Sequence, residues 1–385
     1  MNVNELLRLI PANTFRDLAI ETKVDAQVKK LSGEVIFKLI LFSMLNSDKL
    51  SLRVMETFLH SASFKSFSQF DILDSRYNSI RDRICTIKST YFEKLFEVVF
   101  TTYNKQLGEE HALSKADSTY VALATKLFSH GMQNGSSRAS GKRFVKYSVT
   151  LKGSLPSTIK VYTDQAHVNE DVALSEVIDK SDSVKGNVVV FDRGLHSRRS
   201  FDKFTDDSKF FIGRSQLNVK CKVEKTNKVG VKPFGSTVTI TKDETGLLAA
   251  RSNRKTAHPY RVIKGTIDET GEGICFVTNM LSEDCYLIAD WYRQRWEIEV
   301  FFKFIKQHLN ANHLVSRDEN GIKVMVYMTM IMAILIIAYK KLNGISSFKI
   351  AKLKLEIELE NECIKAIVTL CGGDPSKAAH LFNSG

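Results

Sequence analysis

The sequence predicts an α/β fold in which a mixed β-sheet carries flanking helices and follows an all-helical region. Two observations support this, namely the changing period of the apolar residues and a change of composition. Apolar residues recur at helical spacing to about residue 107, alternate with a period of two from about residue 113, and return to helical spacing after residue 283. Between residues 216 and 286 the chain becomes Lys-rich and β-prone. We therefore expect a helical N-terminal region, a mixed sheet with a β-rich insertion, and a helical C-terminal region.

Residues 1–108 are predicted to form an all-helical N-terminal domain. Ser32 and Ser51 stand where N-caps belong, directly before two segments with apolar residues at three- and four-residue spacing. Short helices joined by tight turns often present one helix to a DNA groove, so DNA binding is a candidate role. Residues 1–110 carry 15 Lys and Arg against 14 Asp and Glu. A plain helical bundle therefore remains an equal alternative.

Residues 109–215 are predicted to form the first part of the core, with three strands in a row followed by alternating strands and helices. Residues 216–286 form the expected β-rich insertion, residues 287–345 a long helix and the end of the core, and residues 346–385 a C-terminal helical segment. The strand patterns cover 113–123, 142–153, 157–164, 186–194, 209–215, 219–229, 236–243, 260–267 and 273–280, and helical patterns cover 170–179 and 197–204.

The chain is basic, and its positive charge is regional. The formal net charge is +12 and the isoelectric point is about 9.2, which suggests a polyanionic partner such as nucleic acid. Residues 220–264 alone carry 11 Lys and Arg against 3 Asp and Glu. Solvated loops are the alternative explanation. The candidate contacts to a DNA backbone are Lys220, Lys222, Lys225, Lys228, Lys232, Arg251, Arg254 and Lys255.

Cysteine usage and the N-terminus favour a reducing cytoplasm. The six cysteines form no C-x-x-C pair, and the first residues lack the apolar core of a signal peptide. The 16-residue apolar run from Val324 to Tyr339 is a little short of the ~20 residues that span a bilayer. We expect a helix buried against a sheet there, rather than a membrane span.

Two aspartates are candidates for a site at the edge of the predicted sheet. Asp117 lies inside a strand pattern, where an aspartate is unfavourable unless it has a function. Asp192 directly follows the buried run 187–191 and precedes Arg193 and Gly194, so it would stand at the carboxyl end of a strand, where sites in α/β sheets gather. Each aspartate alone is better explained as a turn residue, whereas two aspartates at strand edges together favour a site.

The segment 291–309 is predicted to form one amphipathic helix with a polar stripe. At about 100° per residue, Tyr292, Arg295, Glu299 and Lys306 fall within an arc of about 60°. Apolar residues occupy the opposite face, which would pack on a sheet. The alternative is an ordinary solvated stripe with an ion pair between Arg295 and Glu299.

The spacing Tyr-x2-Arg-x3-Glu-x6-Lys formed by these four residues resembles the signature of insertion-sequence DDE transposases of the family numbered four. Asp-Ser-Thr at 117–119 resembles that family's first-Asp motif, and Phe-Asp-Arg-Gly at 191–194 its second. The β-rich stretch is similar to the family's insertion into an RNase H-like core. One departure is Leu195, because an aromatic residue often follows the Asp-Arg-Gly in that family.

The resemblance implies DNA transposition by metal-dependent cleavage and strand transfer. Asp117, Asp192 and Glu299 would be catalytic and would hold two Mg²⁺ or Mn²⁺ ions, because hard cations prefer carboxylate oxygens. The resemblance implies that Tyr292, Arg295 and Lys306 bind DNA phosphates. Trp291 and Trp296 border the stripe and could stack on a base extruded from a duplex end, or could simply belong to the core. Arg193, Arg251, Arg254 and Lys255 are the further basic candidates for DNA binding.

The implied partner is double-stranded DNA, namely transposon terminal inverted repeats and target DNA, bound by a homodimer in a bacterial cytoplasm and associated with the nucleoid. Two other interpretations stay open. An RNase H-like nuclease that cuts without strand transfer would use the same acids, and a non-catalytic DNA-binding derivative of a transposase would share the fold.

Overall fold

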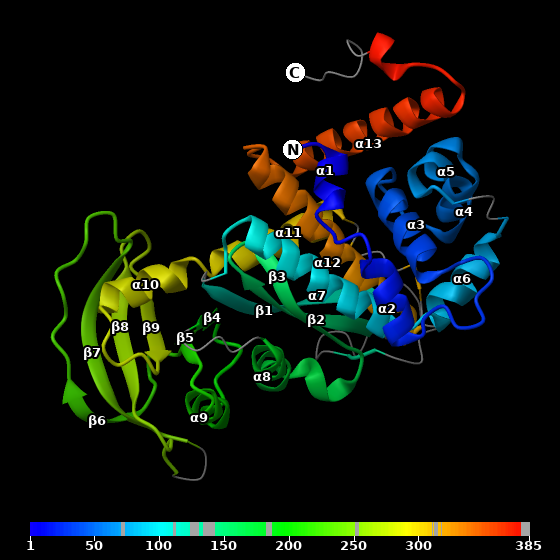
Figure 1. Ribbon diagram of the computed structural model, residues 1–385. Coiled ribbons are helices and arrows are strands. Elements are labelled where there is room, and N and C mark those ends of the chain that lie inside the picture. Colours follow the sequence, from blue (N-terminus) through cyan, green and yellow to red (C-terminus); the bar gives the residue numbers. More distant parts are fainter. Residues whose placement is uncertain are drawn as a thin grey trace. The chain divides into compact units, whose positions relative to one another are not determined.

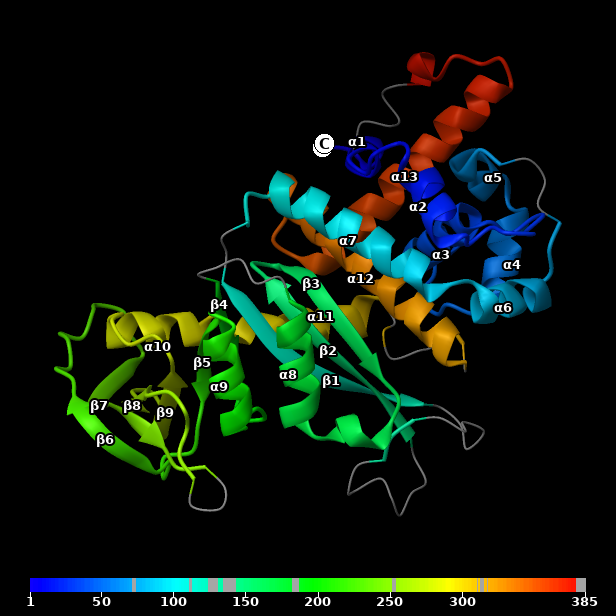
Figure 2. The same cartoon turned by 60° about the horizontal axis from the view of Figure 1, so that its bottom comes forward.

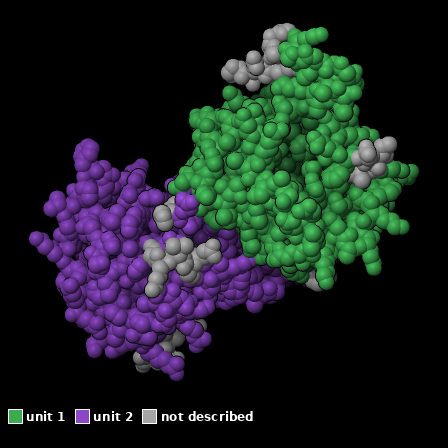
Figure 3. All heavy atoms as spheres, viewed as in Figure 1, with its two compact units in different colours: residues 1–108, 303–385 green, residues 109–302 purple. Residues whose placement is uncertain are grey.

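The structure is a computed structural model that describes residues 1–70, 74–110, 113–123, 131–133, 143–181, 187–250, 254–309, 311, 315–316 and 318–378 (Figure 1). The chain divides into two compact units, coloured separately in Figure 3. Unit 1 comprises residues 1–108 and 303–385, and unit 2 comprises residues 109–302. The helices predicted at the two ends of the chain therefore belong to the same compact unit.

Unit 1 is helical where it is described. Ser32 and Ser51 cap helices as predicted, because each hydroxyl accepts a hydrogen bond from the backbone N–H three residues later. The helices are α1 (Val3–Arg8), α2 (Thr14–Thr22), α3 (Gly33–Leu45), α4 (Leu52–His60), α5 (Ala62–Ser68), α6 (Tyr77–Thr86), α7 (Ser89–Gln106), α12 (Glu319–Leu342) and α13 (Phe348–Leu370), with the short 3₁₀ helix η3 (Pro375–Ala378).

The apolar helix α12 is the core of unit 1. It packs against α3, α6, α7 and α13, and it begins at Asp318, whose carboxylate accepts hydrogen bonds from the backbone of Asn320 and Gly321. Among the described residues it is the one helix long and apolar enough to cross a bilayer, and 94% of its apolar window is buried inside the protein. The prediction that this segment is a buried helix is confirmed, but the prediction that it packs against a sheet is wrong, because its neighbours are other helices.

Unit 2 is built on one nine-stranded mixed sheet, which confirms the α/β class. The strand order is β3-β2-β1-β4-β5-β9-β8-β7-β6, and the neighbours β1, β4 and β5 are parallel while the other pairs are antiparallel. The strands are β1 (Ser114–Leu123), β2 (Arg143–Lys152), β3 (Leu155–Tyr162), β4 (Val188–Phe191), β5 (Phe210–Arg214), β6 (Cys221–Thr226), β7 (Val238–Leu248), β8 (Tyr260–Ile267) and β9 (Gly273–Thr278).

The strands of the β-rich stretch extend this same sheet. β9 pairs with β5 through Ile212 and Thr278, and β6 ends the sheet. Two helices accompany the first half of the sheet, α8 (Glu170–Lys180) and α9 (Arg198–Asp206), with the 3₁₀ helix η1 (Gln165–Val168) before α8. Figure 2 shows α8 and α9 side by side next to β1 and β5.

Both faces of the central strand β4 are covered, which explains its continuous apolar sequence. Val189 and Phe191 pack into one cluster with residues of α8 and α9, whereas Val188 and Val190 pack into a second cluster with residues of helix α10 (Cys285–Arg293). The ring of Phe191 stacks on Phe211 at 5.7 Å between centroids. The buried strand thus fixes the position of its C-terminal end, where Asp192 follows.

The prediction of one continuous helix over 291–309 is wrong. The chain forms α10, which ends at Arg293, and α11 (Trp296–His308), separated by a turn at Gln294 and Arg295. The backbone N–H groups of Arg295, Glu297 and Ile298 each donate to the carbonyl three residues earlier, so the chain is wound more tightly there than an α-helix. No Pro or Gly lies at this break. Tyr292, Arg295 and Glu299 still lie close together on its two sides.

Candidate active site

Adjacent parallel strands bring Asp117 and Asp192 to one place in the sheet. Ala116 of β1 pairs with Phe191 of β4, so the next residue on each strand is one of the two aspartates. The backbone N–H of Ser118 donates to Asp117 at 2.7 Å. Like charge at Asp192 contributes to a raised pKa of Asp117. The two acids, 75 positions apart in the sequence, are therefore electrostatic neighbours.

Arg295 joins Asp117 to Glu299. Its guanidinium donates to Glu299 at 2.6 Å and lies 3.8 Å from a carboxylate oxygen of Asp117. Its side chain is 11% exposed. Burial opposes the charged form, but Tyr292, Glu299 and Asp192 together raise the pKa of Arg295 above its ordinary value. The Nε atom is buried and has no hydrogen-bond partner in the described part of the chain, so the guanidinium keeps one donor to offer.

Tyr292 links the same group to Asp192. Its hydroxyl donates to Asp192 at 3.3 Å, and its ring lies 5.7 Å from the guanidinium carbon of Arg295. Burial raises the pKa of Tyr292 to about 12, so the phenol stays protonated and remains a donor. Three of the four residues of the predicted stripe, Tyr292, Arg295 and Glu299, thus meet the two aspartates.

A salt bridge from a buried lysine to a half-exposed glutamate anchors the start of α11 to the sheet. Lys115 of β1 is 3% exposed and binds Glu297 at 2.9 Å, and it also donates to the carbonyl of Gly153 at 2.7 Å. Because Glu297 and Glu299 lie in the first turn of α11, this contact fixes the turn that carries Glu299. Nothing in the sequence predicted this contact of Lys115, apart from its position two residues before Asp117.

A fourth carboxylate, Glu170, was missed by the sequence analysis. It begins α8, and its side chain lies against Gly194, where an added Cβ would come within 3.1 Å of two of its carbons. Lys146 of β2 is fully buried and binds Glu170 at 2.8 Å. The second oxygen of Glu170 is buried without a hydrogen-bond partner in the described structure. An acid in the first turn of a helix is ordinary, so the sequence carried no signal for it.

The surroundings of Asp117 disfavour its negative charge, so a bound cation would stabilise the carboxylate. The pKa of Asp117 is raised to about 6, mainly by burial and also by the charges of Glu170 and Asp192, against the lowering effects of Ser118 and Arg295. Arg214 follows Gly213, the partner of Phe191 in β5, and its charge acts on Tyr292. This second arginine at the same end of the sheet was also missed.

Divalent ions such as Mg²⁺ prefer oxygen ligands, and Asp117, Asp192, Glu299 and Glu170 supply only carboxylate oxygens. The chemical type of these side chains therefore suits such an ion. The buried oxygen of Glu170 without a partner adds an acceptor beside them. In the described part of the chain, however, no three His, Cys, Asp or Glu side chains stand close enough to hold a metal ion as they lie. Arg295 instead supplies the positive charge between Asp117 and Glu299.

The other predicted site residues fall in three groups. Arg193 and Trp296 are exposed beside the acids, Trp296 with 62% of its surface, whereas Trp291 packs against the core. Lys306 lies on the part of α11 that belongs to unit 1. Arg254 and Lys255 are exposed where the chain returns from β7, with Lys255 bridging to Ala249. Arg251 lies outside the described residues.

The predicted Lys-rich patch lies at and around the edge strand β6. β6 pairs with β7 and ends the sheet, and residues 222–226 are exposed. Lys220, Lys222, Lys225, Lys228 and Lys232 are all exposed as well. Lys232 differs from the others because it binds Asp268 at 2.7 Å.

Comparison with known proteins assigns the chain to a class. The chain belongs to the family of transposase DDE domains. The family's sequence pattern matches residues 115–336, which is more than half of this chain. The matched region begins two residues before Asp117 and includes Asp192 and Glu299. Members of this family generally use divalent metal ions.

Curated relatives agree with this family. The chain is 26% identical over 251 residues to a protein of Geobacillus stearothermophilus provisionally named a transposase for insertion sequence element IS5377, covering 64% of this chain and 62% of that protein. It is 25% identical over 257 residues to a protein of Synechocystis provisionally named a transposase for element IS4SA, covering 63% and 66%. The matches span less than two thirds of the relatives' lengths. The resemblance to insertion-sequence transposases is confirmed.

Proposed function

We propose that the chain is a cut-and-paste DNA transposase that cleaves DNA at transposon ends and joins those ends to target DNA. The observation that carries the proposal is the meeting of Asp117, Asp192 and Glu299 through Arg295 and Tyr292. Asp117 and Glu299 share Arg295, and Tyr292, whose ring lies against the guanidinium of Arg295, donates to Asp192. Family membership supports the same function.

We propose Asp117, Asp192 and Glu299 as the catalytic acids and the ligands of two Mg²⁺ or Mn²⁺ ions. Such ions, when bound, activate an attacking water or 3′-hydroxyl and stabilise the leaving oxygen. Glu170 stands close enough to Asp117 to affect its charge, and it is the acid we would add as a support for this site. The acids are drawn together on rigid elements, because β1 and β4 are paired and Lys115 anchors α11.

The polar stripe is proposed to bind DNA phosphates next to the acids. Arg295 offers a buried Nε–H without a partner in the described structure, and Tyr292 stays protonated and donating. A DNA phosphate would accept charge-assisted hydrogen bonds from Arg295 in place of some of those that Arg295 now makes to carboxylates. Lys306 would add a point charge further along the helix, and exposed Arg193 and Trp296 would contact the strand near its end.

The partner that this assignment implies is double-stranded DNA, as transposon terminal inverted repeats and as target, bound by a homodimer. The Lys-rich patch around β6, apart from Lys232, which is paired with Asp268, would track the DNA backbone, since lysines gain binding free energy by releasing counterions from phosphates. Arg254, Lys255 and Arg251 would extend it.

A cleavage and joining assay tests the proposal. Candidate ends come from the DNA that flanks the coding sequence, and purified protein is incubated with labelled ends with and without Mg²⁺. We expect Mg²⁺-dependent nicks at the ends and joined products, and we expect Asp192→Ala to abolish both while it still binds the ends. Cleavage of ends without joining of pre-cut ends would favour a nuclease. Binding without either reaction in the wild type would favour a non-catalytic derivative.

A further inference from the structure

The loop that begins at Asp192 lies beyond the strand pairing of the sheet. The last paired residue of β4 is Phe191, whose partner in β1 is Ala116. Asp117 differs, because it is itself paired with Val149 of β2. Strand pairing therefore fixes the backbone of Asp117, whereas the backbone of Asp192 needs another support.

One carboxylate oxygen of Asp171 supports the far end of this loop. Asp171 lies in the first turn of α8. Its Oδ1 accepts hydrogen bonds from the backbone N–H groups of His196 at 2.6 Å and of Ser197 at 2.7 Å. The Asp171 side chain is only 15% exposed, and hydrogen bonds to an ionised acceptor are stronger than those between neutral groups. The loop between Asp192 and α9 is thus tied to α8.

The middle of the loop lies against the same turn of α8. A Cβ atom at Gly194 would stand 3.0 Å from Cγ and 3.1 Å from Cβ of Glu170. The next residue, Leu195, is fully buried in the cluster that contains residues of α8 and α9. Its backbone N–H donates to the carbonyl of Asp192 at 3.3 Å, so the chain turns directly after Asp192. A side chain at position 194 would therefore push the loop away from α8.

Lys146 fixes the start of α8 on the strands that hold Asp117. Its side chain is fully buried, and its Nζ binds Glu170 at 2.8 Å. The same Nζ donates to two carbonyls of η1 at 3.0 and 3.2 Å. Lys146 stands on β2, the antiparallel partner of β1. The first turn of α8 thereby connects the loop after β4 to the strand that carries Asp117.

We propose that Asp171 is a positioning residue of the active site, which holds the loop after β4 so that Asp192 stays beside Asp117. The inference rests on the proposed function, because it concerns two acids of the proposed site for divalent ions. Asp171 acts from behind Asp192 and touches neither ion nor DNA. Loss of a residue that orients a metal ligand weakens metal binding, typically by about tenfold or more.

Two substitutions of Asp171 test the support of the loop. Asp171→Ala removes the acceptor of both hydrogen bonds, whereas Asp171→Asn keeps an acceptor oxygen and loses the charge. By hydrogen–deuterium exchange of the full chain, the amides of His196 and Ser197 should exchange at least about tenfold faster in Asp171→Ala. In Asp171→Asn they should stay within about threefold of the wild type. Unchanged exchange in Asp171→Ala would overturn the proposed support.

Calorimetric titration of the full chain with Mn²⁺ tests the effect on the site. We expect the Mn²⁺ dissociation constant to rise about tenfold in Asp171→Ala and less than about threefold in Asp171→Asn. Asp202→Ala is the matched control, because Asp202 of α9 likewise accepts backbone N–H groups, those of Ala257 and His258, and also the hydroxyl of Tyr260. Its loop carries none of the proposed ligands, so Asp202→Ala should lower the unfolding temperature and leave Mn²⁺ binding unchanged.

Gly194→Ala is a second variant, for use if Asp171→Ala does not fold. The added methyl group meets Glu170 and displaces the loop while both hydrogen-bond partners remain. We expect the Mn²⁺ dissociation constant to rise about threefold or more in this variant. Mn²⁺ binding that neither Asp171→Ala nor Gly194→Ala weakens would contradict the inference.

Asp192→Asn separates this inference from the proposed function. Binding of Mn²⁺ that is weakened by Asp192→Asn but not by Asp171→Ala would reject the positioning role alone. Equal weakening in Asp171→Ala and Asp171→Asn would assign the effect to charge, and it too would reject that role. Binding that Asp192→Asn leaves unchanged would remove the proposed ion site, and the positioning role with it.

Discussion

The guanidinium of Arg295 holds together two carboxylates that arrive from distant parts of the sequence. Asp117 and Glu299 would repel each other in a half-buried setting, and the charge of Arg295 offsets that repulsion. The planar fork matters, because it reaches Glu299 with one nitrogen and Asp117 with another. Lysine carries the same charge at one point and makes the two contacts less well.

Arg295→Lys should lower the rate of transposon-end cleavage by about tenfold or more, because the single ammonium leaves one of the two acids without its partner. The measurement is single-turnover cleavage at saturating protein. Arg293→Lys is the control, since Arg293 is exposed and pairs with Asp290 on its own helix. Equal rates in wild type and Arg295→Lys would show that the fork is unimportant.

The sequence predicted the residues whose type is unusual for their position and missed the others. Asp117 and Asp192 stood out because they interrupt or end apolar strand patterns. Glu170 and Lys146 did not, since an acid at a helix start and a lysine in an alternating strand are ordinary. Their role arises from strand pairing, which places β2 and α8 beside β1 and which no local pattern shows.

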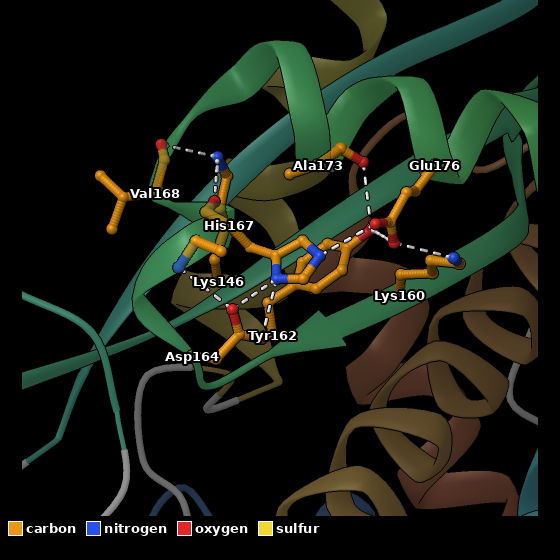
Figure 4. A network of polar contacts seen from close by, with 9 residues as sticks. Lys146, Lys160, Tyr162, Asp164, His167, Val168, Ala173 and Glu176 are labelled. Carbon is orange, nitrogen blue, oxygen red and sulfur yellow. Dashed lines mark hydrogen bonds and ion pairs between the residues drawn. The ribbon is translucent and has the colours of Figure 1, made fainter.

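At the scale of elements, β3, η1 and α8 are joined by a polar network around His167 (Figure 4). The imidazole lies between Asp164 at 2.7 Å and Glu176 at 3.0 Å and stacks on Tyr162. The backbone carbonyl of His167 accepts a hydrogen bond from Lys146, and Lys146 also binds Glu170. The network therefore supports the start of α8, where Glu170 stands by Asp117.

His167→Gln should destabilise unit 2 by about 1 kcal/mol at neutral pH. Burial raises the pKa of Glu176, but hydrogen bonds with His167 and Lys160 outweigh it and hold that pKa below its ordinary value. His167 lowers the pKa of Asp164 against burial in the same way. Stability from a lowered carboxyl pKa is present above the unfolded-state pKa, about 4, and is lost as the pH falls through the folded-state pKa. Urea unfolding from pH 3 to 7 measures this. The gap between the two proteins should shrink below about pH 4, and a constant gap would contradict the account.

The break between α10 and α11 shows what a periodic pattern leaves undecided. Polar residues at the correct spacing predicted a stripe, and Tyr292, Arg295 and Glu299 do share one site. The tight turn at Gln294 lacks any helix-breaking residue, so it follows from tertiary packing. Tyr292 is held by the sheet core, and Glu297 is held by Lys115.

At the scale of the whole molecule, the helical and sheet-forming parts of the sequence separate into two units. The class of each segment was predictable from its period. The union of residues 1–108 with residues 303–385 was not, because helical patterns carry no information about which helices pack together. The net charge of +12 is likewise uneven, and the β6 end of the sheet carries a large part of it.

DNA affinity should fall steeply with salt, because phosphate contacts release counterions. The logarithm of the binding constant against the logarithm of the salt concentration should be linear, and Lys220→Ala with Lys222→Ala should reduce its slope by roughly one per lost contact. Lys232→Ala is the control, since Lys232 is already paired with Asp268. Affinity that hardly changes with salt would exclude a phosphate-tracking patch.

Asp117, Asp192 and Glu299 are proposed to form one site for divalent ions. Fe²⁺ bound in place of Mg²⁺, with ascorbate and peroxide, cuts the polypeptide near its ligands, and mass spectrometry maps the cuts. We predict cuts near all three acids, suppressed by excess Mg²⁺ and lost together in Asp192→Asn, but retained in the exposed-acid control Glu269→Gln. Cuts confined to one acid, or cuts elsewhere that Mg²⁺ leaves unchanged, would contradict the account.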